Sequence, residues 1–499
     1  MSAASARPVA RLDAVALRAA RRQPVTPFAV ALEGDGEVVV EHLLRVLPGK
    51  RIVGEGEWQG RRVLVKLFIA PGSARHAARE QAGIAALQQA ARFGVATPEI
   101  LLAAPLPAGG HLVLTAFLEN AQTLAQAWLA LADLPIDSPI DSPADSPAGS
   151  AAASALLRPA FAAVGRLHAA GLIHDDVHLG NFLRSAGEVY IIDGDSVRAV
   201  SPGTALGERQ AISNLALLFA QLSIDWDACR DDLLAAYHAG GAPTIADGER
   251  LAHEVARVRR CRLDDYLGKT VRECTLFAVE HTPLRFTAAR RAEADALASL
   301  LRAPDVAIGA GVLLKDGGSA TVARVEFAGR PLVVKRYNLK NLRHLCARFW
   351  RPTRAWHSWR AGHLLEFFGV ATPAPLALVE ERVGPLRRRG FLVSEHCPGV
   401  DLLHVLAPER EPDAELAQAL LTLFRRLHAL RISHGDLKAT NLLWHRGRIV
   451  VIDLDSLTVH GSAASHARAW RRDRQRLLRN WPADCALHGW LDASLPPAR

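Results

Sequence analysis

Lysine is scarce in this sequence. Only seven lysines are present, although lysine and arginine together number 60 and the formal net charge is +9. Arginine therefore carries most of the positive charge, and a lysine inside an apolar segment is more informative than it would be in a lysine-rich chain. Lys66 and Lys335 have that setting. The basic surplus is compatible with an anionic substrate, with an anionic membrane surface, or simply with a soluble basic surface.

The sequence also lacks the patterns of disulfide-rich, zinc-binding or membrane-spanning proteins. Its cysteines form no CxxC pair and no metal-ligand spacing, which favours reduced thiols. No apolar run reaches the roughly 18 residues that a transmembrane helix requires. Arginines interrupt the segment 1–25, where a signal peptide would need a continuous apolar core. We therefore expect a soluble, cytoplasmic protein. The cysteines are Cys229, Cys261, Cys274, Cys346, Cys397 and Cys485.

One eight-residue signature occurs twice. Residues 174–181 read HDDVHLGN and residues 434–441 read HGDLKATN, and in each copy an Asp stands twelve residues after the last Asn. An Asp, an Asn five residues later and an Asp after a β-rich segment form the pattern with which kinase-like folds assemble a base and two Mg²⁺ ligands. Turn and capping residues, the alternative, would not explain the same spacing at both places. The predicted bases are Asp176 and Asp436, and the predicted Mg²⁺ ligands are Asn181, Asp193, Asn441 and Asp453.

The repeat extends beyond this signature. In each half an apolar strand with a single Lys follows a Gly-bearing turn, and a helical stretch then ends in the pentapeptide GVATP. A second apolar strand, a helix, the signature and the Asp strand complete the order. This order predicts an α+β fold made twice, a small β-rich lobe joined to a larger helical lobe in each copy. The matching segments are 63–68 and 332–337, 94–98 and 369–373, and 111–117 and 390–396.

The repeat sets the predicted domain boundaries. We expect an N-terminal arm over 1–25, a first kinase-like domain over 26–280 and a second over 281–499. Residues 134–154 contain three Asp-Ser-Pro units, whose composition cannot bury enough apolar area to order the chain. We interpret this segment as a disordered insertion within the first helical lobe, because a linker there would separate Lys66 from its signature.

The remaining candidates concern the nucleotide and the transferred phosphoryl group. A strand Lys beside a Gly-bearing hairpin can reach the α- and β-phosphates of ATP, which predicts that role for Lys66 and Lys335, with Gly317 and Gly318 ahead of the latter. Glu80 is the predicted ion-pair partner of Lys66. The corresponding helix of the second half offers only Glu366, close to its end, so the partner of Lys335 stays open. Lys438, two residues after Asp436, is predicted to neutralise the transferring phosphoryl group; His178 takes that position in the first half.

Four segments of the second half, VVKRYN, HGDLKATNLLW, VVIDLDSL and WRRDRQRLLRNW, together resemble the bacterial lipopolysaccharide inner-core sugar kinases, the Kdo and heptose kinases. The resemblance is strong over about 300–499 and looser over 45–225. It implies a protein-kinase-like fold, ATP and Mg²⁺ as cofactors, and phosphorylation of a sugar hydroxyl of the lipid-linked core oligosaccharide. It also implies peripheral contact with the cytoplasmic face of the inner membrane.

Two departures and two alternatives accompany this interpretation. Asp175 and Gly435 precede the predicted bases where regulated protein kinases have Arg, and no DFG triplet is present, so we expect no activation by loop phosphorylation. The same layout also occurs in protein and small-molecule kinases, and one or both halves could be a non-catalytic nucleotide-binding scaffold for glycan assembly. Basic clusters at 343–360, 387–389 and 471–479 fit phosphate groups, a membrane or solvated helix faces; they lack the aromatic interleaving of a nucleic-acid site, so no nucleic-acid partner is expected.

Overall fold

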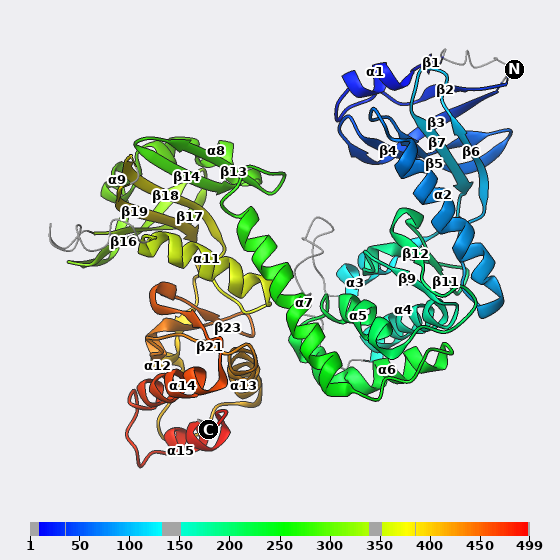
Figure 1. Ribbon diagram of the computed structural model, residues 1–499. Helices are drawn as coiled ribbons and strands as arrows, with labels where there is room; N and C mark the ends of the chain where they lie inside the picture. Colours follow the sequence, from blue (N-terminus) through cyan, green and yellow to red (C-terminus); the bar gives the residue numbers. More distant parts are fainter. Residues whose placement is uncertain (1–8, 35, 132–150, 339–351, 385, 498–499) are drawn as a thin grey trace, which may run out of the picture. The chain divides into compact units, whose positions relative to one another are not determined.

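A computed structural model describes residues 9–34, 36–131, 151–338, 352–384 and 386–497 (Figure 1). The described chain divides into two compact units, one ending at Val258 and the other beginning at Arg259. This division falls inside helix α7 (Gly248–Lys269), whereas the sequence placed the boundary at 280/281. That domain boundary stays a prediction. Strands and helices are mixed in both units, so the expectation of an α+β fold is confirmed.

The first unit begins with a seven-stranded sheet in the order β1-β2-β3-β4-β5-β7-β6. All neighbouring strands are antiparallel except β1 and β2, which are parallel. Helix α1 (Ala14–Ala19) packs Ala14 and Leu17 into the apolar core of this sheet, and α2 (Ala74–Gln89) lies between β5 and β6 in the chain. The strands are β1 (Ala10–Arg11), β2 (Phe28–Leu32), β3 (Gly36–Leu47), β4 (Arg51–Trp58), β5 (Arg61–Phe68), β6 (Ile100–Pro105) and β7 (His111–Ala116).

The predicted N-terminal arm therefore needs a correction over its described residues. Ala10–Arg11 pair with Phe28 and Ala29 as an edge strand, and Leu17 is fully buried, so this segment belongs to the first sheet. Within LDAVAL, Ala14 and Leu17 lie three residues apart and are buried on one face of α1, whereas Val15 is exposed, so an amphipathic helix packs this segment onto the sheet.

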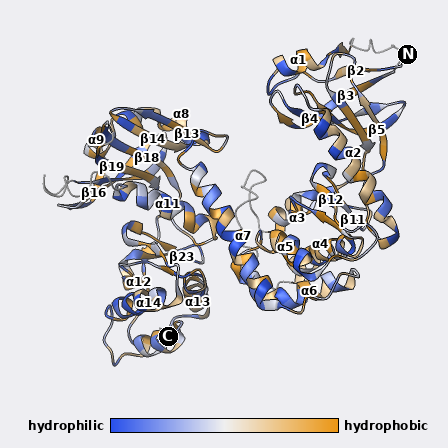
Figure 2. Cartoon of the chain, viewed as in Figure 1, coloured by the Kyte–Doolittle hydropathy of each residue, from blue (hydrophilic) through white to orange (hydrophobic). Residues whose placement is uncertain are grey.

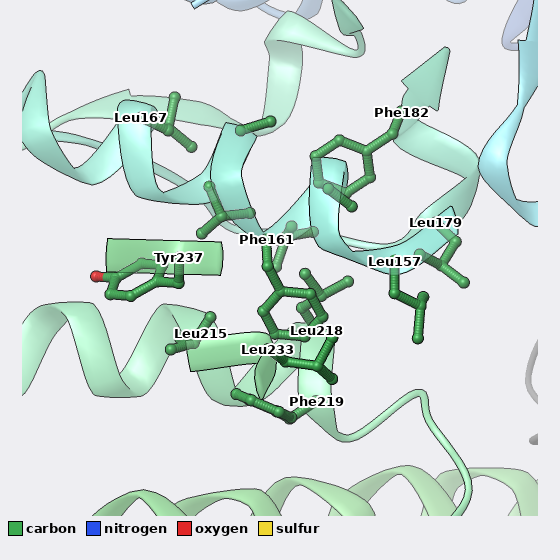
Figure 3. Packing of buried hydrophobic residues seen from close by; sticks show 14 of the residues in the cluster. Leu157, Phe161, Leu167, Leu179, Phe182, Leu215, Leu218, Phe219, Leu233 and Tyr237 are labelled. Atoms are coloured by element: carbon green, nitrogen blue, oxygen red, sulfur yellow. The ribbon is translucent and has the colours of Figure 1, made fainter. Parts of the chain in front are cut away.

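The rest of the first unit is mainly helical. Buried aromatic and aliphatic side chains of α4, α5 and α6 interdigitate to form its core, with Phe161, Phe219 and Tyr237 fully buried (Figure 3). Two small sheets, β11-β10-β8 and β12-β9, carry the signature and the Asp strand. The helices are α3 (Leu124–Leu131), α4 (Ala151–Ala169), α5 (Glu208–Phe219) and α6 (Arg230–Ala239), and the strands are β8 (Gln122–Thr123), β9 (Leu172–His174), β10 (Phe182–Ser185), β11 (Glu188–Ile191) and β12 (Val197–Ala199).

The structure describes only the last four residues of the segment 134–154, which the sequence predicted to be disordered. Residues 134–150 lie outside the described part of the chain. Ala151–Ser154, which the sequence prediction included, form the first turn of α4, and Ala153 is fully buried. The prediction was wrong for these four residues because alanine has the highest helix propensity and here continues into an apolar helical face.

The second unit contains another seven-stranded sheet, in the order β13-β14-β18-β19-β17-β16-β15, and all neighbours in it are antiparallel. Helix α11 (Arg354–Phe367) packs against this sheet, as do α8 (Arg291–Arg302) and α9 (Pro304–Ala310). The strands are β13 (Phe277–Thr282), β14 (Arg285–Arg290), β15 (Val312–Gly317), β16 (Ala320–Phe327), β17 (Arg330–Tyr337), β18 (Pro375–Val383) and β19 (Leu386–Glu395).

A helical part again follows the sheet. Its apolar core joins residues of α11, α13 and α14, among them Phe424 and Trp470, to the two residues Leu263 and Leu267 of α7. Figure 2 shows that hydrophilic residues predominate along α7. The helices are α12 (Leu402–Val405), α13 (Ala414–Ala429), α14 (Ala463–Leu478) and α15 (Ala486–Ser494), and the strands are β20 (Val400–Asp401), β21 (Ile432–Ser433), β22 (Leu442–His445), β23 (Arg448–Val451) and β24 (Thr458–Val459).

The repeated pentapeptide GVATP has the same structural role in both units. The backbone N–H of Ile191 donates to the carbonyl of Ala96 at 2.8 Å, and that of Val451 donates to the carbonyl of Ala371 at 2.8 Å. Both acceptor alanines belong to the pentapeptide, and both donor residues lie two residues before the Asp of the Asp strand. The segment after the helix thus holds the strand that delivers each predicted metal ligand.

Candidate active site

Strand alternation directs Lys66 to the opposite face of its sheet from the apolar core. Val63, Val65 and Leu67 point into that core, so Lys66 points the other way, as period-two geometry requires. Its Nζ donates to Glu80 Oε1 on α2 at 2.5 Å and to Asp193 Oδ1 at 3.3 Å. The structure therefore brings together three of the residues that the sequence singled out in the first half.

Lys335 is oriented by β17 in the same way, with Leu332 and Val334 in the sheet core. Its Nζ donates to Asp453 Oδ1 at 2.5 Å and to Asp455 Oδ1 at 2.8 Å. The partner that the sequence left open is therefore Asp455, two residues after the predicted metal ligand. Glu366 is engaged elsewhere, because its carboxylate pairs with Arg290 at 2.5 Å and with His363 at 3.2 Å.

Two hydroxyl groups hold Asp455 in position. The hydroxyls of Tyr337 and Ser358 donate to Asp455 Oδ1 at 2.7 and 3.0 Å. Burial and the charge of Asp455 raise the pKa of Tyr337 well above its ordinary value, so its hydroxyl remains a donor. Ser358 lies on α11 and contacts Asp455, the second Asp of the turn after β23. In the first unit Glu80 on α2 likewise contacts the second Asp of the corresponding turn, because it accepts from the backbone N–H of Asp195 at 3.0 Å. Serine is too short to reach the lysine, and Asp455 supplies the missing carboxylate.

The two predicted metal-binding aspartates have the same backbone conformation. Asp193 has φ 67° and Asp453 has φ 61°, the left-handed region that a non-glycine residue adopts only when its surroundings require it. Burial alone would raise the pKa of both carboxyls. The charges of Lys66 and Arg51 outweigh burial at Asp193, and Lys335 does so at Asp453, so both pKa values lie below the ordinary value. Both side chains are thus held as carboxylates.

The predicted asparagine ligands are tied to the predicted bases. Asn181 Nδ2 donates to the carbonyl of Asp176 at 2.9 Å, and Asn441 Nδ2 donates to that of Asp436 at 2.8 Å. The amide oxygen of each asparagine is left free of this bond. The carbonyls of Asn181 and Asn441 also accept from the residues immediately before Asp193 and Asp453, at 3.0 Å in both units. These bonds link the loop that carries the base to the strand that carries the acidic ligand.

Each signature loop is anchored by a side chain of a neighbouring helix that the sequence analysis did not identify. In the second unit the buried Asp473 of α14 accepts from the backbone N–H groups of His434 and Gly435, at 2.6 and 3.0 Å. In the first unit Asn214 of α5 accepts from His174 N at 3.3 Å and donates to its carbonyl at 2.8 Å. Burial raises the pKa of Asp473 although these bonds oppose it. The only sequence signal was a lone Asp within WRRDRQ.

The two predicted bases have different surroundings. Asp176 is 68% exposed, and His178 Nε2 lies 3.7 Å from Asp176 Oδ2. Asp436 is only 26% exposed. Lys438 Nζ donates to its Oδ2 at 3.0 Å, and Arg476 of α14 donates to its Oδ1 through a short ion pair. Arg476 was part of a predicted basic cluster, and the structure shows that it reaches Asp436.

A cavity of about 330 Å³ lies in the second unit between the sheet and the Asp strand. Lys335, Asn441 and Asp453 line it together with apolar residues of β17 and β19. Such a largely apolar pocket with a few convergent polar groups has the character of a small-molecule site. Gly317 and Gly318 do not line it. They lie at the turn of the β15–β16 hairpin, whose residues Leu314, Lys315 and Val322 do.

The donor set fits Mg²⁺ bound together with a nucleotide. Asp453 offers a carboxylate and Asn441 an amide oxygen, the hard oxygen ligands that Mg²⁺ prefers, and both line the same cavity. Within the described part of the chain, no group of three or more His, Cys, Asp or Glu side chains forms a metal site by itself. A nucleotide-bound Mg²⁺ needs only one or two protein ligands, because phosphates and water complete its shell.

The sequence of the second unit matches a known family. Residues 315–486 match the lipopolysaccharide kinase (Kdo/WaaP) family. A 75-residue segment is 37% identical to the 3-deoxy-D-manno-octulosonic acid kinase of Mannheimia succiniciproducens, and it covers 15% of this chain and 31% of that protein. The chain thus spans about a third of the length of this curated relative.

Solved structures also resemble parts of the chain. WaaP in complex with acyl carrier protein is 21% identical, with a TM-score of 0.32, over 45% of this chain and 88% of that one. Vaccinia related kinase 3 is 11% identical, with a TM-score of 0.28, over 51% of this chain and 95% of that one. Among the described helices, none has both the length and the apolar composition needed to cross a bilayer.

Proposed function

We propose that the protein is an ATP- and Mg²⁺-dependent kinase that phosphorylates a sugar hydroxyl of the lipopolysaccharide core, on Kdo or heptose, because residues 315–486 match the lipopolysaccharide kinase (Kdo/WaaP) family. The observation that carries this proposal is the convergence of Lys335, Asn441 and Asp453 on one cavity, with the amide of Asn441 bonded to the carbonyl of Asp436. These are the group types that phosphoryl transfer from ATP requires.

In this proposal each residue of the second unit has a separate task. Lys335, held by Asp455, binds the α- and β-phosphates of ATP. Asn441 and Asp453 would hold Mg²⁺, which supplies charge neutralisation at the phosphates. The carboxylate of Asp436 accepts the proton of the sugar hydroxyl. At the same time the oxygen of that hydroxyl bonds to the γ-phosphorus, and the bond between the γ-phosphorus and ADP breaks. Lys438, next to Asp436, neutralises charge on the transferring group.

The first unit is proposed to be a further kinase-like domain in tandem with the second unit. Lys66 contacts Asp193 as Lys335 contacts Asp453, and Asn181 is bonded to the carbonyl of Asp176 as Asn441 is to that of Asp436. Glu80 holds Lys66 where Asp455 holds Lys335, and Asp176 is the proposed base. One observation favours a second candidate function for this unit, nucleotide binding without transfer. His178 stands in the position of Lys438, and Asp176 is far more exposed than Asp436.

The proposed partners are ATP and the lipid-linked core oligosaccharide. An enzyme acting on such an acceptor would work at the cytoplasmic face of the inner membrane, where exposed arginines favour anionic headgroups. Exposed arginines of α14 give this contact a physical basis. No nucleic-acid partner is proposed.

The decisive experiment removes one base at a time from the full-length chain. We expect Asp436→Ala to reduce phosphate transfer to core oligosaccharide by at least about 10³-fold while ATP affinity changes little, because Asp436 acts on the acceptor and does not line the nucleotide cavity. Asp176→Ala is the matched variant of the other unit. Transfer is followed with radiolabelled ATP and nucleotide affinity by calorimetry. Full turnover in the Asp436 variant would overturn its assignment as the base.

The acceptor needs its own test. Mass spectrometry of core oligosaccharide from a strain lacking the protein should show the loss of one phosphate, which complementation restores. An unchanged phosphate content would instead favour a protein or small-molecule acceptor.

A further inference from the structure

Both carboxylate oxygens of the proposed base Asp436 are engaged by cations. Lys438 Nζ lies 3.0 Å from Oδ2, and Arg476 Nη1 pairs with Oδ1 and also lies 3.4 Å from the carbonyl of Gly435. A carboxylate that has to accept a proton from a sugar hydroxyl needs an oxygen directed at that hydroxyl. The arginine contact therefore competes with the proposed reaction unless something else engages Arg476.

Arg476 is available for such an exchange. Its side chain is 46% exposed, and within the described chain only Nη1 of its guanidinium makes a hydrogen bond, which leaves Nη2 and Nε available. A guanidinium has five donors in a planar fork that matches carboxylate and phosphate groups bidentately. The other carboxylate nearby, Asp473, is buried and bonded to backbone N–H groups, so it does not compete for the open side of the fork.

The surface around Arg476 is basic. Arg472 lies four residues before Arg476 and Arg479 three residues after it, on the same exposed face of α14, and Arg468 continues this face by another turn. Lys438 adds a further exposed ammonium on the other side of Asp436. An anionic group approaching the proposed base thus meets positive charge on both sides.

The described residues of the first unit contain no equivalent of this arrangement. Asn214 anchors its signature loop as Asp473 does in the second unit, and three residues further along the helix stands the half-buried Leu217 where α14 has Arg476. His178 replaces Lys438. The anion-binding features are therefore confined to one of two otherwise matching loops. If the fold itself required them, both loops would have them.

We propose that Arg476 is an acceptor-binding residue that recognises an acidic group, carboxylate or phosphate, on the sugar to be phosphorylated. When the acidic acceptor binds, the guanidinium moves from Asp436 to the acid group, and Asp436 Oδ1 becomes free to accept the hydroxyl proton. The inference rests on the proposed function of the second unit and adds the acceptor class: acidic sugars are substrates, and neutral sugars of the same shape are poor ones.

The test uses the full-length chain with Kdo, its methyl ester, heptose and a heptose phosphate as acceptors. For Arg476→Leu we expect the acceptor KM to rise about 10- to 100-fold for the acidic compounds, as the loss of a charged hydrogen-bonded pair predicts. The KM for ATP and the KM for the ester should stay unchanged. Arg476→Lys should restore part of the affinity, and Arg410→Leu, a change at an exposed arginine outside α14, should match the wild type. An equal loss of kcat for acid and ester, with unchanged acceptor KM, would overturn the proposal in favour of a structural role.

Equilibrium binding separates this proposal from the function on which it rests. Calorimetry with Kdo and its ester, in the presence of a non-hydrolysable ATP analogue, needs no turnover. Preferential binding of the acid that disappears in Arg476→Leu would support the acid site even if no phosphate is transferred, in which case only the kinase assignment fails. Equal binding of acid and ester by the wild type would overturn the acid site whatever the transfer assay shows.

Discussion

The two clefts hold their lysines by different means. In the first unit Glu80 of helix α2 reaches Lys66 directly, and Asp195 of the following turn is turned towards Arg79, with 3.2 Å between Arg79 Nε and Asp195 Oδ1. In the second unit helix α11 presents Ser358 to the turn. Asp455 of this turn contacts Lys335 and accepts a hydrogen bond from the hydroxyl of Tyr337. The lysine is thus paired with a carboxylate in both units, but the carboxylate comes from a helix in the first unit and from a turn in the second. A missing helix glutamate is therefore no evidence that a cleft of this kind is inactive.

The close approach of helix and turn differs as well. In the first unit Gly83 and Gly194 face each other, and a Cβ on Gly83 would come within 1.9 Å of the carbonyl oxygen of Gly194. In the second unit Leu454 stands at the position of Gly194 and lines the cavity. The glycine pair lets α2 approach the turn closely enough for a helix glutamate to reach the lysine. Where leucine intervenes, the carboxylate comes from the turn.

Among the variants that test this comparison, the largest expected effect concerns Asp455. Replacing it by Asn removes the charge that orients Lys335, and we expect kcat/KM for ATP to fall about 10²-fold, the cost of a misplaced binding group. Asp195→Asn should change nucleotide affinity little, because Glu80 holds Lys66 in that unit. Steady-state kinetics at varied ATP checks this result, with calorimetry for nucleotide affinity.

Glu366→Gln is the control for Asp455, because Glu366 pairs with Arg290 and His363. Asp455→Glu, which keeps the charge, should recover part of the activity. If Glu366→Gln lowered kcat/KM for ATP as much as Asp455→Asn, the difference between the two clefts would not exist.

A smaller effect is expected at Gly194. A Cβ there would come within 2.5 Å of the carbonyl oxygen of Glu80, so Gly194→Ala should force α2 away and lower the free energy of unfolding by about 1–3 kcal/mol. Gly248→Ala, where a Cβ meets open space, is the control. Urea denaturation measures both variants. Weaker nucleotide binding by Gly194→Ala would connect the close approach to the Lys66–Glu80 pair, whereas unchanged stability would contradict the packing argument.

The smallest effect is one that both units share. Burial lowers the pKa of His168 and of His363 to about 4, from an ordinary value of 6.5. Both side chains are therefore neutral in the folded protein, while the unfolded chain binds a proton at each below pH 6.5. Stability is unaffected above that pH and falls as the pH drops from 6.5 towards 4. When the pH is lowered from 7.5 to 5.5, each histidine should lower the free energy of unfolding by about 1.4 kcal/mol.

His168→Gln and His363→Gln should each flatten this pH dependence, which urea denaturation at the two pH values measures against the wild type. His168 bonds to Tyr237 and Asn214, and His363 bonds to Tyr266 and lies beside Glu366, so each variant loses some stability at neutral pH as well. An unchanged pH dependence in both variants would contradict the burial argument.

Much of the arrangement was predictable because its signals are local. Period-two strands carry Lys66 and Lys335, the Asp and Asn of each signature have fixed spacing, and the pentapeptide GVATP recurs before each signature. Those patterns predicted an α+β fold and the ion pair of Lys66 with Glu80. The boundary at 280/281 and the catalytic and metal roles stay predictions. The N-terminal arm and Ala151–Ser154 were misjudged, because charge and composition in these segments obscured the short helix α1 and the first turn of the long helix α4.

The amino-acid sequence alone determined which groups are repeated and how far apart along the chain they stand, because strand alternation and loop spacing follow from covalent geometry over a few residues. Which group meets which across the fold was decided only by tertiary packing. Asp455 reaches Lys335 and Arg476 reaches Asp436 over separations of 120 and 40 residues. No local pattern encodes these contacts, because they depend on how closely a helix can approach a turn and on which face of α14 lies under the loop.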